Sequence, residues 1–543
     1  MNAAAEKRSN PEPEVLIVGA RTTGLMLAIQ LRRQGISVRI VDHSPCIDPH
    51  SRASLLHSRS LELLQGLGLA EEIAAHGQVL RGFRLFADRR EVLHTRDPPV
   101  DSPFPYAIAY AQPKIEAILE RRLRELGVAV ERNTTLIAME READQVRVVL
   151  RSSNGRDQAT AAAWVVGCDG AHSATRKLQD LALMGDDSPY AYIVADVRME
   201  NDHPPDTSFS CLHEDGHLLV TVLDEGRRLM AGSLPLGHSG QGEPSLPEMQ
   251  AIVDRRLGGG HSLSDPRWLD YFRVHYRVAE RYRVGRVFLA GDAAHLNSPF
   301  GGHGMNTGLQ DAANLAWKLA LVIEGVASDR LLDSYETERR PAGEAMVAAS
   351  KRTTEPGETY PRLSEDERRG LLAAFPTTTQ ERLAFRRGFE ELDLDYGAGA
   401  LCRDGDPSLP DELRPGRQAR DAPGLRREGK ACGLFDLLAG PKHVLLIFPP
   451  AEPEEATTPL RPLLEKNGFW MSPLLVGSQA PLRANITFPP CLIDAAGALR
   501  QRYGMSAGGL YLLRPDGYIA YRSRDFGSLA CYVDSLLAEG SLN

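Results

Sequence analysis

GDAAHLNSPFGGHGMNTGLQDAANLAWKL, residues 291–319, is the stretch that decides the fold of this 543-residue chain. Residues 286–290 before it form a short apolar run that predicts a buried strand. Apolar residues over 309–320 then recur at helical spacing. The junction holds an acid, a proline and several glycines, so backbone can approach a flat polar ligand and a helix N-terminus can point at it. The alternative is a Gly-rich loop without a ligand, and two further motifs weigh against it.

Composition excludes several classes of protein. Hydrophobic residues make up 42% of the chain and charged residues 25%, which is ordinary for a globular protein of about three domains. The net charge of −9 gives no electrostatic case for nucleic-acid binding. Seven widely spaced cysteines form no CxxC and no metal-ligand pair, so we predict reduced thiols, no metal site and a cytoplasmic protein. We expect neither a signal peptide nor a membrane span, because no early apolar run is long enough.

A second motif opens a predicted β-α-β unit. A buried strand runs into Gly19-Ala20-Arg21-Thr22-Thr23-Gly24, a helix follows over 25–34, and a second strand ends at Asp42. In a dinucleotide-binding fold the first glycine makes a tight turn, the last lets helix and strand pack, and the acid accepts hydrogen bonds from a ribose. Arg21 replaces the glycine that gives the pyrophosphate room. Its side chain must therefore turn outward or offer its guanidinium to a phosphate.

A third motif, Cys168-Asp169-Gly170, follows another predicted buried strand. Asp-Gly is a turn dipeptide, so an ordinary strand-to-helix turn with Ser173 as the cap is the alternative to a ligand site. Alternating patterns over 190–280 predict a sheet between this motif and residues 291–319. Pieces of one cofactor-binding fold therefore flank an inserted domain.

The C-terminal part has its own pattern. Residues 395–430 are rich in Gly, Pro, Asp and Arg, which predicts a linker. Beyond it, strands and helices alternate around the turn Arg514-Pro515-Asp516-Gly517. This region lacks CxxC, which argues against thioredoxin-type redox work and favours a structural or dimerisation module.

Together the three motifs resemble those of the flavin-dependent aromatic hydroxylases, the single-component class A FAD monooxygenases that act on phenols and aromatic polyketides. The segment 51–53, Gln112 and the segment 335–341 fit the same family. The C-terminal region resembles the thioredoxin-like domain of the natural-product branch. The resemblance implies an α/β fold, in which a Rossmann-like FAD-binding domain carries an inserted antiparallel-sheet substrate domain and is followed by a C-terminal thioredoxin-like domain.

This fold class sets the expected domain boundaries. The FAD-binding domain is discontinuous, and the substrate-binding domain is made of two insertions. The expected ranges are 14–75, 108–185 and 283–345 for FAD binding, 76–107 and 186–282 for the substrate domain, 346–400 for a helical segment, and 401–543 for the linker and the thioredoxin-like domain.

The resemblance also implies roles for individual residues. Asp292 is expected on the ribityl chain of FAD, Pro299 beside the reactive edge of the flavin, and Asp169 in a dual role toward FAD and NAD(P)H. The full set of expected cofactor-binding residues is Gly19, Ala20, Thr23, Gly24, Asp42, His43, Arg52, Gln112, Asp169, Asp292, Pro299, Gly304, Met305 and Asn306.

The implied activity is hydroxylation of an aromatic, polycyclic natural product, with NADPH or NADH as a transient reductant and O2 captured at C4a of the flavin. The expected partners are these small molecules, with a homodimer as a further expectation. Two alternatives stay open. One is a flavoprotein of this fold that performs Baeyer–Villiger or another oxygenation. The other is a non-catalytic ligand-binding protein whose FAD site is weakened by Arg21.

Four residues are catalytic candidates: Pro299, His303, His275 and Tyr276. His303 either adds positive potential near the flavin or is a solvent-facing or capping residue. His275 and Tyr276 lie on an alternating strand, so one of them faces inward and could take a proton from a phenolic substrate. Sheet packing or a surface position is the alternative for each.

Overall fold

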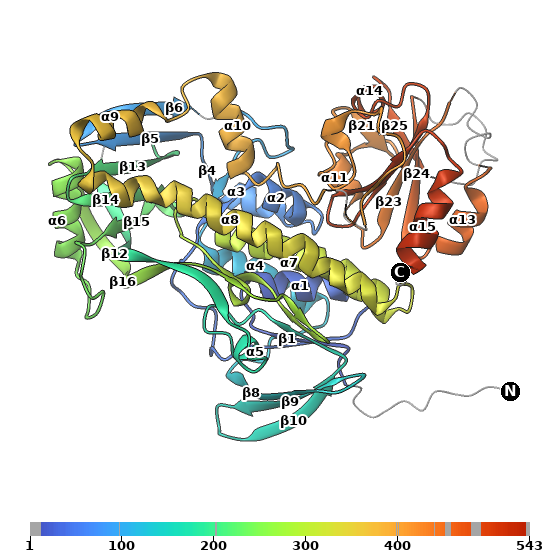
Figure 1. Cartoon of the computed structure of the whole chain (residues 1–543), viewed down its shortest axis with the longest axis horizontal. Coiled ribbons are helices and arrows are strands. Elements are labelled where there is room, and N and C mark those ends of the chain that lie inside the picture. Colours follow the sequence, from blue (N-terminus) through green and yellow to red (C-terminus); the bar gives the residue numbers. More distant parts are fainter. Residues whose placement is uncertain are drawn as a thin grey trace.

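The computed structural model describes residues 12–96, 98–200, 203–397, 399, 401–438, 440–450, 458–478 and 490–538. Figure 1 shows a large N-terminal body with the C-terminal domain packed on one side of it. The predicted α/β fold class is confirmed, whereas the thioredoxin-like character of the C-terminal domain stays a prediction.

A five-stranded sheet carries the three motifs. Its order is β17-β18-β11-β1-β2, and the last four strands run parallel. The motifs follow the carboxyl ends of β1, β11 and β18, which are neighbours in the sheet, so all three meet at one edge. The strands are β1 Val15–Val18, β2 Val38–Val41, β11 Trp164–Gly167, β17 Arg283–Val284 and β18 Val287–Leu289.

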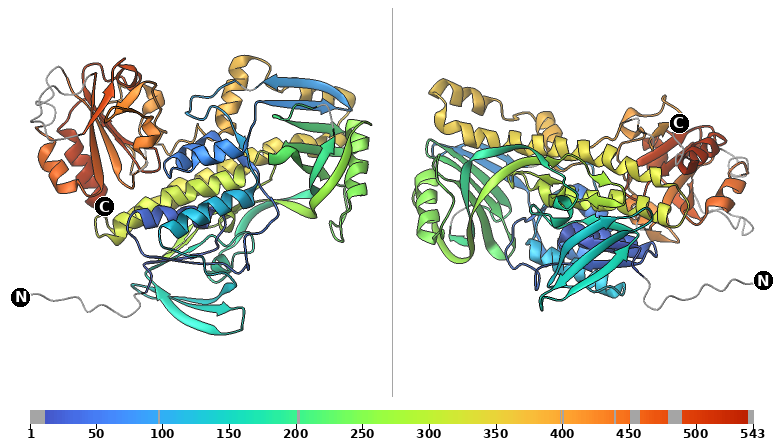
Figure 2. Two further views of the ribbon diagram at one scale, coloured as in Figure 1. Left: turned by 180° about the vertical axis from the view of Figure 1, so that it is seen from behind. Right: turned by 60° about the horizontal axis from the view of Figure 1, so that its bottom comes forward.

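Helices cover this sheet and place the motif loops. α1 (Thr22–Arg33) packs against both α4 (Gln112–Glu125) and α7 (His303–Ile323), as the rear view in Figure 2 shows. Smaller elements surround them: β3 Leu55–Leu56, α2 Ser58–Gln65, α3 Ala70–His76, β4 Gln78–Val79, β7 Ile108–Ala109, β8 Thr134–Arg141, β9 Val146–Ser152, β10 Asp157–Ala162 and α5 Ala174–Lys177.

The inserted domain is an eight-stranded sheet of order β19-β16-β12-β15-β14-β13-β5-β6. It is antiparallel as predicted, except that β13 and β5 pair in parallel. α6 (Leu246–Leu257) covers one face over an apolar cluster. The strands are β5 Gly82–Ala87, β6 Arg90–Arg96, β12 Leu183–Glu200, β13 Thr207–His213, β14 Gly216–Val222, β15 Arg227–Ser233, β16 Ser262–Ala279 and β19 His295–Leu296.

The other face of this sheet meets α8 (Asp333–Thr359), a long helix that crosses the expected boundary at 345/346 without a break. α9 (Glu365–Ala373) and α10 (Thr379–Phe389) follow, and each begins with a complete capping box. No helix in the described part of the chain is both long and apolar enough to cross a membrane.

The C-terminal domain is built on a second eight-stranded sheet, β20-β27-β26-β23-β24-β25-β21-β22, with an apolar cluster on each face. Three short strands, β20, β21 and β22, begin within the predicted 395–430 linker and lie at the two ends of this sheet. The elements are β20 Arg403–Asp404, β21 Leu425–Arg427, β22 Lys430–Ala431, α11 Leu434–Leu437, β23 His443–Phe448, α13 Arg461–Asn467, β24 Met471–Gly477, β25 Cys491–Asp494, α14 Ala498–Arg502, β26 Gly509–Leu513, β27 Ile519–Ser523 and α15 Ser528–Ala538.

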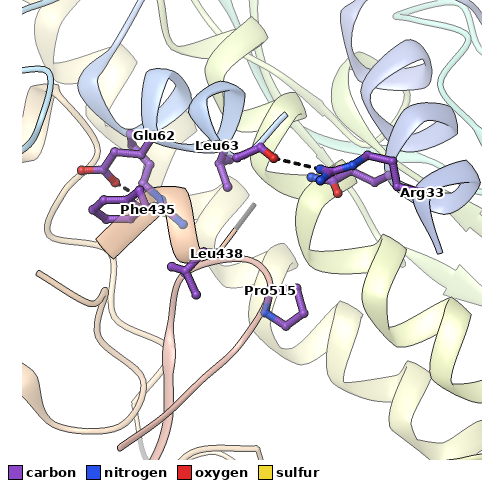
Figure 3. A pocket seen from close by; sticks show the side chains of 10 residues that line it. Arg33, Glu62, Leu63, Phe435, Leu438 and Pro515 are labelled. Atoms are coloured by element: carbon purple, nitrogen blue, oxygen red, sulfur yellow. Dashed lines mark hydrogen bonds and ion pairs between the residues drawn. The ribbon is translucent and has the colours of Figure 1, made fainter. Parts of the chain in front are cut away.

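One turn of the C-terminal domain docks on α7 and α8. Arg514 and Asp516 enter a buried cluster with Glu338 and Lys318. Arg514 donates to Glu338 at 2.7 and 2.9 Å and to Asp516 at 2.5 Å, and Lys318 donates to Glu338 at 2.7 Å. Figure 3 shows the adjoining pocket, which is lined in part by Pro515. Its volume of about 10 Å³ is enough for one water molecule. The seam between the domains is therefore closely packed.

Candidate functional site

Two glycines determine how closely β1, α1 and β11 meet. Gly19 has φ +105°, and a Cβ atom there would lie 2.2 Å from the carbonyl oxygen of Cys168. A Cβ atom at Gly24 would lie 1.9 Å from the carbonyl oxygen of Gly19. Only glycine fits either position. Among the described residues, no side chain caps the N-terminus of α1, so its first N–H groups are available to an anion.

The first and last motif segments are locked together by Thr23. Cβ atoms added at Gly291 and Gly308 would lie 2.6 and 2.3 Å from its hydroxyl oxygen. Thr23 thus packs α1 against α7 and does not face the edge of the sheet. This close packing puts the Gly19–Gly24 turn and the start of α7 on the same side of the sheet.

Asp42 supports the β1–α1 turn. Its carboxylate accepts hydrogen bonds from the backbone N–H groups of Ala20 at 2.7 Å and Ser44 at 2.8 Å. Asp42 is buried, whereas the neighbouring His43 side chain is 73% exposed. Each carboxylate oxygen keeps a second lone pair, so accepting from a ribose remains chemically open to Asp42.

Arg21 turns away from the Gly19–Gly24 turn and pairs with Asp48 at 2.7 Å. Arg52 lies 3.4 Å from the same carboxylate, so two guanidinium groups share one acid. Of the two orientations open to Arg21 from the sequence, the structure shows the outward one. Both arginine side chains are partly exposed and carry positive charge at the edge of the site.

Gln112 and Asp169 both organise backbone. Gln112 begins α4, and its N–H group donates to the hydroxyl of Ser51, which brings the two expected segments together. Asp169 accepts from the hydroxyl of Ser173 at 2.5 Å and from the N–H of Thr175 at 2.9 Å. Ser173 is the N-cap of α5, as in the alternative of an ordinary strand-to-helix turn. Asp169 stabilises the same turn through its two hydrogen bonds.

Asp292 is the open carboxylate of the site. Its side chain is exposed to solvent. Desolvation by the surrounding protein nevertheless raises the pKa of Asp292, and this effect outweighs the charges of His295, Arg21 and Arg52, which lower it. A Cβ atom at Gly304 would lie 3.9 Å from Asp292 Oδ1, so the carboxylate stands close to the first turn of α7. That N-terminus has no side-chain cap among the described residues, and Pro299 before it is exposed. The arrangement offers a ligand one carboxylate, free N–H donors and an open loop.

Asn306 and Met305 are buried behind this opening. Asn306 accepts from the N–H of His57 at 3.0 Å, and it donates to the carbonyls of Leu55 at 2.9 Å and Gly302 at 2.6 Å. These three hydrogen bonds join the segment before α2 to the turn before α7. Asn306 therefore shapes the loop from behind.

His303 is 3% exposed and belongs to a buried cluster of four side chains: His57, His303, Glu390 and Glu391. It is therefore neither a solvent-facing nor a capping residue. Its Nδ1 lies 2.9 Å from Glu391 Oε1. The His303 and His57 rings are 5.1 Å apart, and His57 Nδ1 lies 3.6 Å from Glu390 Oε2. No sequence pattern predicts this group, because its members are up to 334 positions apart and follow no motif.

His57 is the charged member of this group. Burial alone would lower the pKa of His57, but the hydrogen bond and charge of Glu390, with the charge of Glu391, outweigh it and raise the pKa above 6.5. The pKa of Glu390 is lowered below 4.5, because His57 and Arg386 outweigh the effect of its burial. Opposite charges on the two side chains therefore stabilise the fold between about pH 4.5 and 6.5, the ordinary pKa values of the two groups.

We expect wild-type thermal stability to fall as the pH rises through the raised pKa of His57. Neutral His57 no longer pairs with Glu390, which keeps Arg386 at 2.7 Å, and the stabilisation from His57 is fully present only below 6.5. A His57→Gln variant should melt lower at pH 6 and show a flatter dependence on pH. Melting curves from pH 5 to 9 measure this, with the exposed His172→Gln as the control. Parallel pH profiles for wild type and H57Q would contradict the assignment.

The two candidates on β16 face opposite ways. His275 is half-exposed and pairs with Asp187 at 2.7 Å on the outer side of the sheet. Tyr276 faces inward, where burial raises its pKa to about 12. A phenol with that pKa stays protonated at neutral pH. Neither side chain is therefore placed as a proton acceptor for a substrate.

Comparison with known proteins settles the family. Residues 12–350 match the model described as "FAD binding domain". This chain belongs to that family. The predicted FAD cofactor and the predicted flavoprotein family are confirmed.

Members of known activity resemble the chain over most of its length. It is 31% identical over 537 residues to 6-methylpretetramide 4-monooxygenase of Streptomyces rimosus, covering 95% of this chain and 92% of that one. It is 30% identical over 538 residues to pentachlorophenol 4-monooxygenase of Sphingobium chlorophenolicum, covering 96% of each. The solved structure of OxyS anhydrotetracycline hydroxylase from Streptomyces rimosus superposes with a TM-score of 0.74 at 27% identity, covering 97% of this chain and 99% of that one.

Proposed function

We propose that this FAD-binding protein hydroxylates an aromatic, polycyclic substrate, using NADPH or NADH and O2. The observation that carries the proposal is the meeting of three motifs at one edge of the parallel sheet, with two uncapped helix N-termini beside them. Two relatives that match nearly the whole chain are named as monooxygenases, one of 6-methylpretetramide and one of pentachlorophenol, which supports oxygenation of an aromatic substrate.

The residues at this edge fit FAD. The Gly19–Gly24 turn and the free N–H groups of α1 would receive the pyrophosphate, with Arg21 and Arg52 adding positive charge at the rim. Asp292 would accept from hydroxyls of the ribityl chain, and its open position beside an uncapped helix start suits a polar ligand chain. When bound, FAD supplies the reductive activation of oxygen and its transfer to the ring.

The protein contributes positioning, charge and exclusion of water. The first turn of α7 presents the positive end of a helix dipole behind the loop that begins with Pro299. On the inserted sheet, the Tyr192 ring stacks on the Phe272 ring with their centres 5.4 Å apart. The centre of the Phe300 ring lies 5.3 Å from that of Tyr192, so the three rings form an aromatic wall next to that loop. Tyr192 and Phe300 are buried, so this stack would keep water from the reacting edge, while the partly exposed Phe272 ring could meet an aromatic substrate. We propose that the nicotinamide binds transiently and that the chain forms homodimers.

Purified protein tests this proposal directly. We expect a yellow protein with bound flavin that oxidises NADPH or NADH faster in the presence of a polycyclic phenol and releases a product one oxygen atom heavier. Product structure separates ring hydroxylation from Baeyer–Villiger insertion. Protein that stays colourless after incubation with FAD would instead support the ligand-binding alternative.

A further inference from the structure

The end of α10 brings two adjacent buried carboxylates to the turn Gly301-Gly302 before α7. They come from the helical segment 346–400, for which the proposed function has no role. Glu390 and Glu391 are 0% and 4% exposed. Their imidazole partners belong to two other elements: His57 precedes α2, and His303 opens α7. Acids so deeply buried are retained only when they are paired.

His57 is held between two acceptors. Its Nε2 lies 2.9 Å from the carbonyl oxygen of Gly301, and its Nδ1 faces Glu390 at 3.6 Å. Its Nε2–H group therefore donates to Gly301, and Nδ1 lies at ion-pair distance from Glu390. His57 thus connects the turn before α7 to the end of α10.

Glu391 does the same for His303. Besides the 2.9 Å contact with His303 Nδ1, its carboxylate accepts a hydrogen bond from the side-chain amide of Gln310, which lies about two turns further along α7. A Cβ atom at Gly301 would lie 3.0 Å from His303 Nε2, so the ring lies directly against the turn. The orientation of this ring and the shape of the turn are thus coupled.

The backbone at Glu391 shows that its side chain matters. Glu391 follows the end of α10 with φ +58°, in the left-handed region that favours glycine at this position. A glutamate there is strained relative to glycine. Gln418 of the C-terminal domain donates to its carbonyl at 2.9 Å and holds this conformation. The strained position supports a role for the carboxylate itself.

We propose that Glu390 and Glu391 are positioning residues for the flavin, which hold His57 and His303 against the turn Gly301-Gly302 in the shape that receives the isoalloxazine. This inference rests on the proposed function. His303 then contributes a fixed Nδ1–H group toward Glu391 and a fixed ring edge toward the loop. α10 acts on the cofactor site without touching the cofactor.

The test uses the full-length holoenzyme with E390Q and E391Q. The matched control is E62Q, since Glu62 is equally buried and accepts from Arg59 and Ser102 at 2.8 Å at the seam with the C-terminal domain. Three quantities are measured: the FAD dissociation constant from flavin fluorescence, the midpoint potential of bound FAD, and the melting temperature of FAD-free protein. We expect E390Q and E391Q to weaken FAD binding about tenfold and to shift the potential, because each removes a buried carboxylate charge beside an imidazole ring. E62Q should change the melting temperature alone.

A second background separates positioning from simple loss of stability. Since Glu391 acts through His303, E391Q should change FAD binding less than twofold when introduced into His303→Gln, a non-additivity expected of coupled residues. Equal effects of E391Q in both backgrounds, or an unchanged FAD affinity and potential, would overturn the inference while wild type still binds FAD. Stoichiometric bound metal that E391Q loses would also overturn it, because His57, His303 and Glu391 would then be ligands, their donor atoms lying within 4.8 Å of one another. Wild-type protein that takes up no FAD would overturn this inference and the proposed function together.

Discussion

Replacement of Arg514 by methionine should lower the free energy of unfolding by about 3–5 kcal/mol. The Arg514 guanidinium is fully buried and binds Glu338 and Asp516 at once. Burial raises the pKa of Glu338, but Arg514 and Lys318 outweigh it and lower the pKa to about 2. Methionine fills similar space while leaving two buried carboxylates with one lysine between them. Denaturant unfolding followed by circular dichroism measures the loss.

The matched control is Arg151→Met, which removes an equally close but exposed pair with Asp157 at 2.7 Å. Surface pairs contribute about 0–1 kcal/mol, so R151M should behave almost as wild type. The R514M deficit should also shrink as the pH falls from 4.5 toward the lowered pKa of Glu338, because protonation removes the carboxylate charge that the variant leaves with Lys318 alone. A deficit no larger than that of R151M would show that the docking turn adds little to stability.

This cluster changes what the C-terminal domain contributes. The Arg514 guanidinium lies 5.1 Å from the ring centre of Trp317, about four turns along α7 from its N-terminus at the cofactor site. Asn314 and Trp317 of α7 also donate hydrogen bonds to Asp516. The domain therefore braces the same helix that carries His303. The missing CxxC favours a structural role for the C-terminal domain, and the contacts of Arg514 give that role a physical basis.

Local patterns in the sequence were enough to predict the cofactor-binding core. The strand at Val15–Val18 and the glycines after it follow from hydrophobic runs and turn chemistry within a few residues. The inserted sheet follows from alternation along its strands. Parallel pairing then brings the three motifs together, because all follow the carboxyl ends of neighbouring strands.

The buried charged groups could not be predicted in the same way. Glu390 meets His57 across 333 positions, and Arg514 meets Glu338 across 176, and neither pair has a spacing rule that points to it. Each of these residues alone is typical of a solvated helix or turn. The edge strands in 395–430 were missed for a related reason, since short edge strands carry little apolar pattern.

Replacement of Gly24 by alanine should weaken FAD binding by about 10- to 100-fold, the cost of overpacking a close contact. The added Cβ atom would lie 1.9 Å from the carbonyl oxygen of Gly19, so α1 must move away from the β1 turn. That shift displaces the N–H groups proposed to receive the pyrophosphate. Alanine favours the helix, so the variant should keep its secondary structure and fail mainly in cofactor binding.

Gly370→Ala is the control for this variant. Gly370 lies within α9, and no described atom would come within 4 Å of an added Cβ, so alanine should leave FAD binding unchanged and add up to about 1 kcal/mol of stability. Flavin absorbance per protein and the FAD dissociation constant distinguish the two variants. If G24A bound FAD as tightly as G370A, the contact between α1 and the Gly19 turn would not set the geometry of the pyrophosphate site. If G24A lost FAD with its far-ultraviolet dichroism intact, that contact would be the feature that lets this turn bind FAD although Arg21 occupies the position of a glycine.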